Sequence, residues 1–119
     1  MSGILKETIP SCIPLTLSGP SLADEVARGV PTAVVAACPN TDYSKLAQEL
    51  FHTTTFRVYT SQDILGVELG GALKNIIAIG AGICDGMNFG ANSKAALVTR
   101  AIVEIRRLGT VMGADPNTF

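Results

Sequence analysis

The sequence is poor in the residues on which metal sites and disulfide frameworks depend. It has no tryptophan, one histidine (His52) and three cysteines among 119 residues. Cys12, Cys38 and Cys84 are odd in number and widely spaced, and no pair has the spacing of a zinc site or a redox motif. We therefore expect reduced thiols, a reducing compartment and no bound metal.

Charged residues are also scarce, at 16% of the chain, and the formal net charge is −1. No run of lysine or arginine is present, so the sequence lacks the basic surface of a nucleic-acid-binding protein, and we expect no such partner. Hydrophobic residues make up 47%, which suits a buried core. The first ten residues contain Lys6 and Glu7 and no apolar core of signal-peptide length.

One stretch, residues 64–84, is apolar and about as long as a membrane span. Glu68, Lys74 and Asn75 lie near its middle, and each central charge costs roughly 2.5–3.5 kcal/mol on insertion into a bilayer. Glycines weaken the span further. We therefore predict a helix buried inside protein rather than a membrane span.

The first half of the chain alternates between strand and helix patterns. Ser21 to Asp24 fits a helix capping box, and Gly29 is a natural helix stop. The β-α-β-α-β order predicts part of an α/β sheet with three mainly parallel strands. The predicted strands are residues 13–18, 31–37 and 56–59, and the predicted helices are residues 21–28 and 41–51.

The second half lacks a strand pattern. Residues 64–84 predict a helix that its glycines bend or interrupt, and residues 85–91 predict a loop. Asn92 or Ser93 is expected to cap a second helix with an apolar face. The change of composition near Thr60 predicts a domain boundary there. Neither half is self-sufficient, because three strands or two helices cannot bury their own apolar faces.

Lys74 is the first candidate for chemistry. Its helical neighbours, including Gly70 and Ile77, are small or apolar, and a lysine that loses hydration there would have a lowered pKa and could exchange a proton. The alternative is a lysine whose stem packs while its ammonium reaches water. Asn75 could orient a substrate hydroxyl or satisfy a helix carbonyl. Both alternatives stay open on these residues alone.

Two glycine-containing segments are further candidates. Gly70 and Gly71 allow either close helix packing or close approach of a ligand, at a cost of about 1 kcal/mol each relative to alanine. Residues 19–21 lie where a strand leads into a helix, where free backbone N–H groups can hold an oxygen-rich ligand. Alternatively, Ser21 is only a helix cap.

These segments occur together in the order of one known family. Residues 18–27 read SGPSLADEVA and resemble the SGPSFAxEVA segment of the NAD(P)-dependent glycerol-3-phosphate dehydrogenases. Residues 56–59 resemble the FRVY of that family, and residues 66–75 match its GVELGGALKN block, which is highly specific. The similarity extends from about Ile13 to Phe119.

The resemblance implies roles for five residues. In this family the lysine of GALKN, here Lys74, gives and takes the proton at the C2 oxygen of the substrate. The glycine and serine of SGPS, here Gly19 and Ser21, contact glycerol 3-phosphate. The alanine that follows them, Ala23, lies against the nicotinamide cofactor, and Asn75 is a further substrate contact. The cofactor is NAD or NADP.

The resemblance also implies the fold class, α/β followed by all-α. Residues 1–60 would be the C-terminal part of a Rossmann-like domain, and residues 61–119 the first helices of a helical substrate domain. The GxGxxG turn and the KGI lysine of the family are expected before Met1, and its GDL aspartate and RN pair after Phe119. We therefore expect a fragment that is inactive by itself.

The enzyme implied by the resemblance interconverts sn-glycerol 3-phosphate and dihydroxyacetone phosphate and supplies glycerol 3-phosphate for glycerophospholipid synthesis. We expect a cytoplasmic homodimer, with a plastid location as the alternative. Leu22 replaces the usual phenylalanine, and Ala91 replaces an aspartate of the family's GFGDN loop. Two other hypotheses remain: a related dehydrogenase of the 6-phosphogluconate or UDP-glucose type, and a truncated product that acts only in association.

Overall fold

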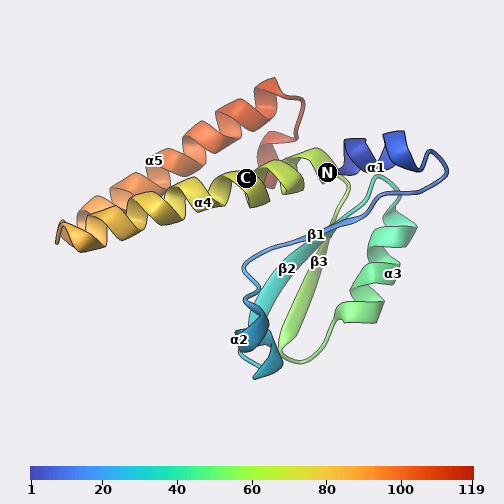
Figure 1. Cartoon of the computed structure of the whole chain (residues 1–119), viewed down its shortest axis with the longest axis horizontal. Helices are drawn as coiled ribbons and strands as arrows, with labels where there is room; N and C mark the ends of the chain where they lie inside the picture. The colour runs from blue at the N-terminus through green and yellow to red at the C-terminus, as the bar shows by residue number, and fades with distance from the viewer. The chain divides into compact units, whose positions relative to one another are not determined.

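The computed structural model describes residues 1–119 and divides into two compact units, Met1–Glu68 and Leu69–Phe119. The division falls inside one long helix, α4 (Ile64–Gly86). The predicted domain boundary near Thr60 stays a prediction, because compactness alone does not define a domain. The predicted fold class, α/β followed by all-α, is confirmed by the order of the elements (Figure 1).

The first unit is a three-stranded sheet with three short helices. Its strands lie in the order β1-β2-β3, so the middle strand in space is also the middle strand in sequence. Figure 1 shows α3 alongside the sheet. The elements are α1 (Ser2–Thr8), β1 (Thr16–Ser18), α2 (Ala23–Ala27), β2 (Thr32–Ala37), α3 (Thr41–Phe51) and β3 (Phe56–Ser61).

The strand directions differ in part from the prediction. β2 and β3 are parallel, with Val34 opposite Val58, but β1 runs antiparallel to β2, with Leu17 opposite Ala36. Parallel pairing needs a connection that returns the chain along the whole strand. The 13 residues that join β1 to β2 contain only the five-residue α2, which advances about 7.5 Å, and they reverse the chain instead of returning it along the sheet. The prediction of three mainly parallel strands was therefore wrong for β1, and the sheet is mixed.

The core of this unit is built on β2. Val34, Ala36, Ala47 and Val58 form one buried cluster, to which β2, α3 and β3 all contribute. The Val58 carbonyl accepts a hydrogen bond of 2.6 Å from the side-chain amide of Gln48 on α3. These contacts hold α3 against the parallel strand pair, and its bounds are those predicted from the apolar stripe.

The chain reverses direction around α2. The predicted capping box is wrong: Leu22 is the N-cap, no side chain caps the helix, and the Ser21 hydroxyl instead donates to the Gly19 carbonyl at 3.3 Å. Such local bonds of serine compete with capping. Gly29 ends the turn with a φ of +72°, a left-handed conformation that favours glycine, as predicted.

The carboxylate of Glu68 joins three elements of the first unit. It accepts hydrogen bonds from the Ser2 backbone N–H at 2.8 Å, the Ser2 hydroxyl at 2.9 Å and the Thr16 hydroxyl at 3.2 Å, and it lies 3.4 Å from the amino group of Met1. Partial burial raises the pKa of Glu68, but these donors together outweigh burial, so the pKa lies below its ordinary value. The ionised carboxylate is therefore the form that the fold favours.

The second unit is a helical hairpin. The remainder of α4 leads into α5 (Gly90–Val111), and a short 3-10 helix, η1 (Pro116–Thr118), follows. Of the two predicted effects of the glycines, a bend or an interruption, the interruption is wrong, because α4 is one continuous helix. The loop is shorter than predicted because α4 extends to Gly86 and α5 begins at Gly90. Phe89 is the N-cap, so neither Asn92 nor Ser93 caps the helix. The left-handed conformations of Asn88 and Gly90 make the turn.

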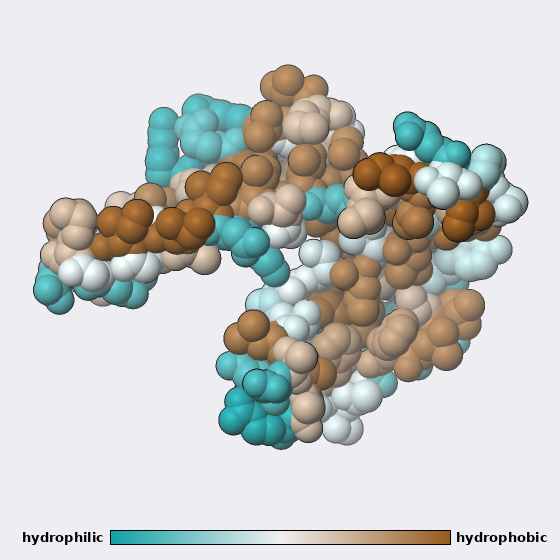
Figure 2. Space-filling model, in the orientation of Figure 1, coloured by the Kyte–Doolittle hydropathy of each residue, from teal (hydrophilic) through white to brown (hydrophobic).

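Helix α4 is long and apolar enough to cross a membrane by length and composition, with a mean hydropathy of 1.5. It was predicted to be buried, but Ile76, Ile79 and Ile83 are each more than half exposed within this chain. Figure 2 shows hydrophobic surface along this helix. The prediction of burial is thus not met within these residues, because α5 can cover only one face of α4.

Gly19 is a position where the fold admits no side chain. Its φ is +156°, and an added Cβ would lie 2.8 Å from both the Ala33 carbonyl oxygen and the Val34 Cα of β2. We predict that Gly19→Ala lowers the free energy of unfolding by about 1–3 kcal/mol, because backbone atoms cannot yield as a side chain can. Gly82→Ala is the matched control, since an added Cβ there meets nothing within 4 Å, and alanine should raise stability by up to about 1 kcal/mol. Equal urea midpoints for Gly19→Ala and the parent would contradict the prediction.

Glu68 should make the stability of the first unit depend on pH in the acid range. Its pKa in the folded chain lies below the ordinary glutamate value of 4.5, so the stabilisation is fully present above that pH and is lost as pH falls through the folded value. We predict that the stability difference between the parent and Glu68→Gln shrinks between pH 5 and pH 3, measured by urea unfolding. Glu49→Gln, at an exposed position on α3, is the control and should show no such convergence.

Candidate functional site

The five predicted site residues lie on two segments. Gly19, Ser21 and Ala23 are within the turn from β1 into α2, in the first unit, whereas Lys74 and Asn75 are adjacent on α4, in the second unit. The structure therefore brings together the three residues of the first segment and the two of the second. Each segment has its own local geometry.

The first segment is fixed by the close approach of Gly19 to β2. Ser18 pairs with Val35 in the antiparallel register, and the next residue, Gly19, packs its backbone directly against Ala33 and Val34. The chain then turns away, so that Ser21 and Ala23 are exposed. A bound substrate could therefore reach the Ser21 hydroxyl, which otherwise donates only at 3.3 Å to the Gly19 carbonyl.

The start of α2 is a weaker anion site than the sequence predicts. The helix has five residues, and its first turn carries Asp24 and Glu25. The partial positive charge at a helix N-terminus acts within the first turn, and these carboxylates already occupy that region. The exposed Ser21 hydroxyl and the backbone around Gly19 remain the groups on this segment that could contact an oxygen-rich ligand.

Lys74 and Asn75 are both exposed on α4. The expectation that small neighbours would deprive Lys74 of water is not met within this chain, because glycine and alanine leave space beside a lysine stem rather than covering it.

Gly70 lies beside the ring of Phe119 in the second unit. The ring of Phe119 lies 3.8 Å from the position that a Cβ on Gly70 would take. On the facing helix, an added Cβ at Gly109 would lie 2.6 Å from Cε2 of the same ring. One aromatic ring thus sits against glycines of both α4 and α5. A Cβ on Gly70 would be in ordinary van der Waals contact with the ring, so close packing requires a glycine at position 109 and not at position 70.

Sequence reasoning missed the interactions of three charged residues. Asp85 near the end of α4 pairs with Lys94 near the start of α5 at 2.5 Å, beside a cavity of about 560 Å³ that Ala91 also lines. Glu68 was treated only as a charge that disfavours membrane insertion, although it joins α1, β1 and α4. The partners of Glu68 lie 52 and 66 residues away in sequence, so no local pattern could have indicated them.

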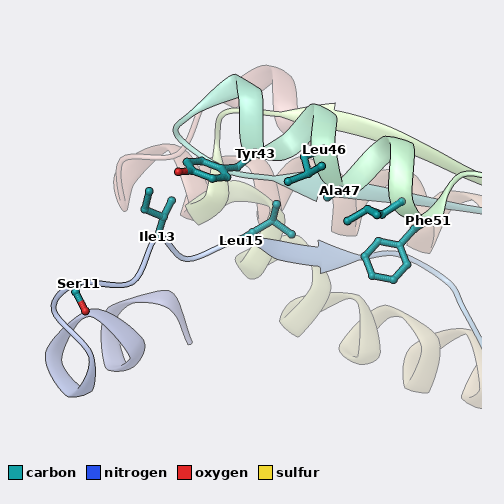
Figure 3. A pocket seen from close by; sticks show the side chains of 8 residues that line it. Ser11, Ile13, Leu15, Tyr43, Leu46, Ala47 and Phe51 are labelled. Carbon is teal, nitrogen blue, oxygen red and sulfur yellow. The ribbon is translucent and has the colours of Figure 1, made fainter.

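A separate apolar groove lies between α3 and the segment that precedes β1. It has a volume of about 440 Å³ and contains none of the predicted site residues. Figure 3 shows Ile13 and Leu15 of that segment on one side and Tyr43, Leu46 and Phe51 of α3 on the other. No carboxylate, amine or imidazole lines it, and its polar side chains are the hydroxyls of Ser11 and Tyr43. Its lining is Ser11, Ile13, Leu15, Tyr43, Leu46, Ala47, Leu50 and Phe51.

Two family models match consecutive parts of the chain. The model of the NAD-dependent glycerol-3-phosphate dehydrogenase N-terminus matches residues 1–44, and the model of the C-terminus of the same family matches residues 63–119. The first match includes Gly19, Ser21 and Ala23, and the second includes Lys74 and Asn75. Both predicted site segments therefore lie in regions that the family models describe.

Individual relatives agree with these matches. The glycerol-3-phosphate dehydrogenase of Pelotomaculum thermopropionicum is 62% identical over 105 residues, which are 88% of this chain and 30% of that protein. The enzyme of the same name from Yersinia pestis is 49% identical over 121 residues, which are 100% of this chain and 36% of that protein. The chain thus spans about a third of the length of the curated relatives that it matches.

Solved structures give the same result for the fold. The crystal structure of glycerol-3-phosphate dehydrogenase from Coxiella burnetii matches with a TM-score of 0.90 and 44% identity, over 98% of this chain and 36% of that one. The Saccharomyces cerevisiae enzyme matches with a TM-score of 0.89 and 29% identity, over 99% and 36%. Sequence, family models and fold agree, and the chain belongs to the NAD-dependent glycerol-3-phosphate dehydrogenase family, of which it represents about a third of the usual length.

Proposed function

We propose that this chain supplies part of the active site of an enzyme that interconverts sn-glycerol 3-phosphate and dihydroxyacetone phosphate. The observation that carries the proposal is Lys74, which lies exposed on an unbroken helix within the family-specific GVELGGALKN block. Both family models are those of the glycerol-3-phosphate dehydrogenases, which argues against the alternative of a related dehydrogenase of the 6-phosphogluconate or UDP-glucose type. The product of the reductive direction would supply glycerophospholipid synthesis.

Lys74 would handle the proton of the reaction. In the reductive direction its ammonium hydrogen-bonds the C2 carbonyl oxygen of dihydroxyacetone phosphate, which makes C2 more electrophilic, and then gives its proton to that oxygen. In the oxidative direction the neutral amine takes the proton from the C2 hydroxyl of glycerol 3-phosphate. A positioned group of this kind typically contributes about 10²–10⁴-fold to the rate.

The remaining predicted residues would bind and orient. The Ser21 hydroxyl can donate to a substrate oxygen in place of the Gly19 carbonyl, and the packing of Gly19 against β2 fixes the backbone from which Ser21 projects. Asn75, next to Lys74 and equally exposed, can donate to a substrate oxygen through its side-chain amide. Neither residue carries a charge, so neither would compete with Lys74 for the proton.

Ala23 is the residue of this chain that would lie against a nicotinamide cofactor. It is exposed at the first residue of α2, so a cofactor could reach its methyl group. NAD or NADP would supply the hydride chemistry when bound. No GxGxxG turn follows a strand in this sequence, so residues other than these would have to hold the pyrophosphate. We propose that the complete enzyme is a cytoplasmic homodimer, because the resemblance to the family leads us to expect one.

The proton role of Lys74 can be tested in a hybrid enzyme in which this chain replaces the aligned segment of the Coxiella burnetii dehydrogenase. We predict that Lys74→Met lowers kcat by about 10²–10⁴-fold while cofactor affinity changes little. Lys74→Arg should be similarly impaired, because guanidinium does not release its proton near neutral pH. Lys45→Met, an exposed lysine on α3, is the control and should keep the activity of the parent. Near-parental kcat in Lys74→Met would remove the central claim.

The isolated chain should show no turnover of glycerol 3-phosphate with NAD or NADP. It contains Lys74 and the SGPS segment but no pyrophosphate-binding turn. The measurement is NADH or NADPH formation by purified chain, followed by absorbance, with the hybrid enzyme as the positive control. Turnover that co-purifies with the chain and is lost in Lys74→Met would show that the chain is sufficient.

A second candidate function, association without catalysis, is favoured by one observation. Ile76, Ile79 and Ile83 form an exposed apolar stripe on α4. If association is the role of the chain, sedimentation should show concentration-dependent oligomers that Ile79→Glu dissociates, and the hybrid enzyme should be indifferent to Lys74→Met.

A further inference from the structure

Glu68 is a charged side chain with several hydrogen bonds, and the proposed mechanism does not use it. Three donors from Ser2 and Thr16 surround its carboxylate at 2.8–3.2 Å. Its side chain is 17% exposed. A carboxylate with this many donors is fixed in position, and it fixes the donors in turn.

One of those donors is at the start of the strand that leads to the predicted substrate segment. Thr16 is the first residue of β1, and Gly19 follows the last residue of the same strand. The strand is three residues long, so few ladder hydrogen bonds hold it. Its position depends on Glu68 at one end and on the close packing of Gly19 against β2 at the other.

Glu68 itself lies on a well-anchored part of α4. The Asp63 carboxylate accepts the Gly66 backbone N–H at 2.9 Å, and the Ser61 hydroxyl accepts the Asp63 backbone N–H at 3.1 Å. Gly66 and Val67 are buried. These hydrogen bonds and buried residues hold the first turns of α4 in place, and the same unbroken helix continues to Lys74.

We propose that Glu68 is a positioning residue for the dehydrogenase. Its carboxylate fixes the start of β1 to the first turns of α4, and β1 leads directly into the segment that contains Gly19 and Ser21. The inference rests on the proposed function of that segment and assigns Glu68 no contact with substrate. The N–H and hydroxyl of Ser2 use the remaining acceptor sites of the same carboxylate, so α1 is held by the same group.

Glutamine at this position cannot reproduce the arrangement. A carboxylate offers two acceptor oxygens, whereas a glutamine side chain offers one and turns an N–H₂ donor towards the other partners. At least one of the three donors would then lose its acceptor. Glu68→Gln keeps the size of the side chain, so it changes the hydrogen bonding with little change in packing.

The first measurement uses the chain itself. Amide hydrogen exchange by NMR should be at least about fivefold faster at Ser2 and along β1 in Glu68→Gln than in the parent, while α5 is unchanged. Glu49→Gln is the control, because Glu49 is exposed on α3. Unchanged exchange at both Ser2 and β1 would overturn the inference. Should Glu68→Gln fail to fold, Thr16→Val, which removes one donor, makes the same measurement possible.

The second measurement is kinetic and uses the hybrid enzyme. Glu68→Gln should lower kcat by about 10–100-fold, because small misplacement of a binding group is costly in rate, with the KM for cofactor within about twofold of the parent. Thr16→Val should also lower kcat, and the double variant should lose no more than the worse single variant, since both remove one interaction. A purely structural role predicts lower thermal stability with parental kcat, and that result would overturn the inference.

Lys74→Met in the same preparation separates this inference from the proposed function. If Lys74→Met is inactive and Glu68→Gln has parental kcat, only the positioning role fails. If Lys74→Met retains activity, or if the folded parent hybrid has none, the proposed function fails, and the hydrogen-exchange result still decides whether Glu68 fixes β1.

Discussion

The structure depends on the burial of β2 between two neighbouring strands and one helix. Backbone pairing joins it to β1 and β3, and its small side chains let α3 pack across it. Val34 and Ala36 are almost completely buried, and Val58 of β3 completes the contact. Because β2 is the only strand with two partners, β1, β3 and α3 are all positioned through it. The antiparallel pairing of β1 brings the chain past β2 at Gly19, where only a residue without a side chain fits.

Much of the fold could be predicted from sequence because its signals are local. The stripe of Tyr43, Leu46, Ala47 and Leu50 defines α3, and the Asn40 side chain accepts the backbone N–H of Asp42 at its start. The apolar run of β2 and the change to helices were also read correctly. The direction of β1 was not predicted correctly, because it depends on the path of the connection that contains the five-residue α2. Pairing direction is a property of the connection rather than of the strand.

For the candidate site, the sequence could propose which residues belong to it but not what surrounds them. Motif resemblance identified Gly19, Ser21, Ala23, Lys74 and Asn75, and the family models include all of them. The environment of these residues was less predictable. Lys74 is exposed because its small neighbours cannot cover it, and Ser21 bonds to Gly19 rather than capping α2. The role of Glu68 is a long-range property, since its donors come from the first two elements of the chain.

The ring of Phe119 illustrates how glycine can be required without any unusual backbone. It rests on Gly70 of α4 and Gly109 of α5, and each glycine is in regular helix. The three positions therefore share one volume. Positions 109 and 119 are therefore linked through evolution: a methyl group gained at position 109 requires the ring at position 119 to move or to be replaced by a smaller residue, whereas a methyl group at position 70 would simply touch the ring. Sequence covariation between positions 109 and 119 would record a contact that neither position reveals alone.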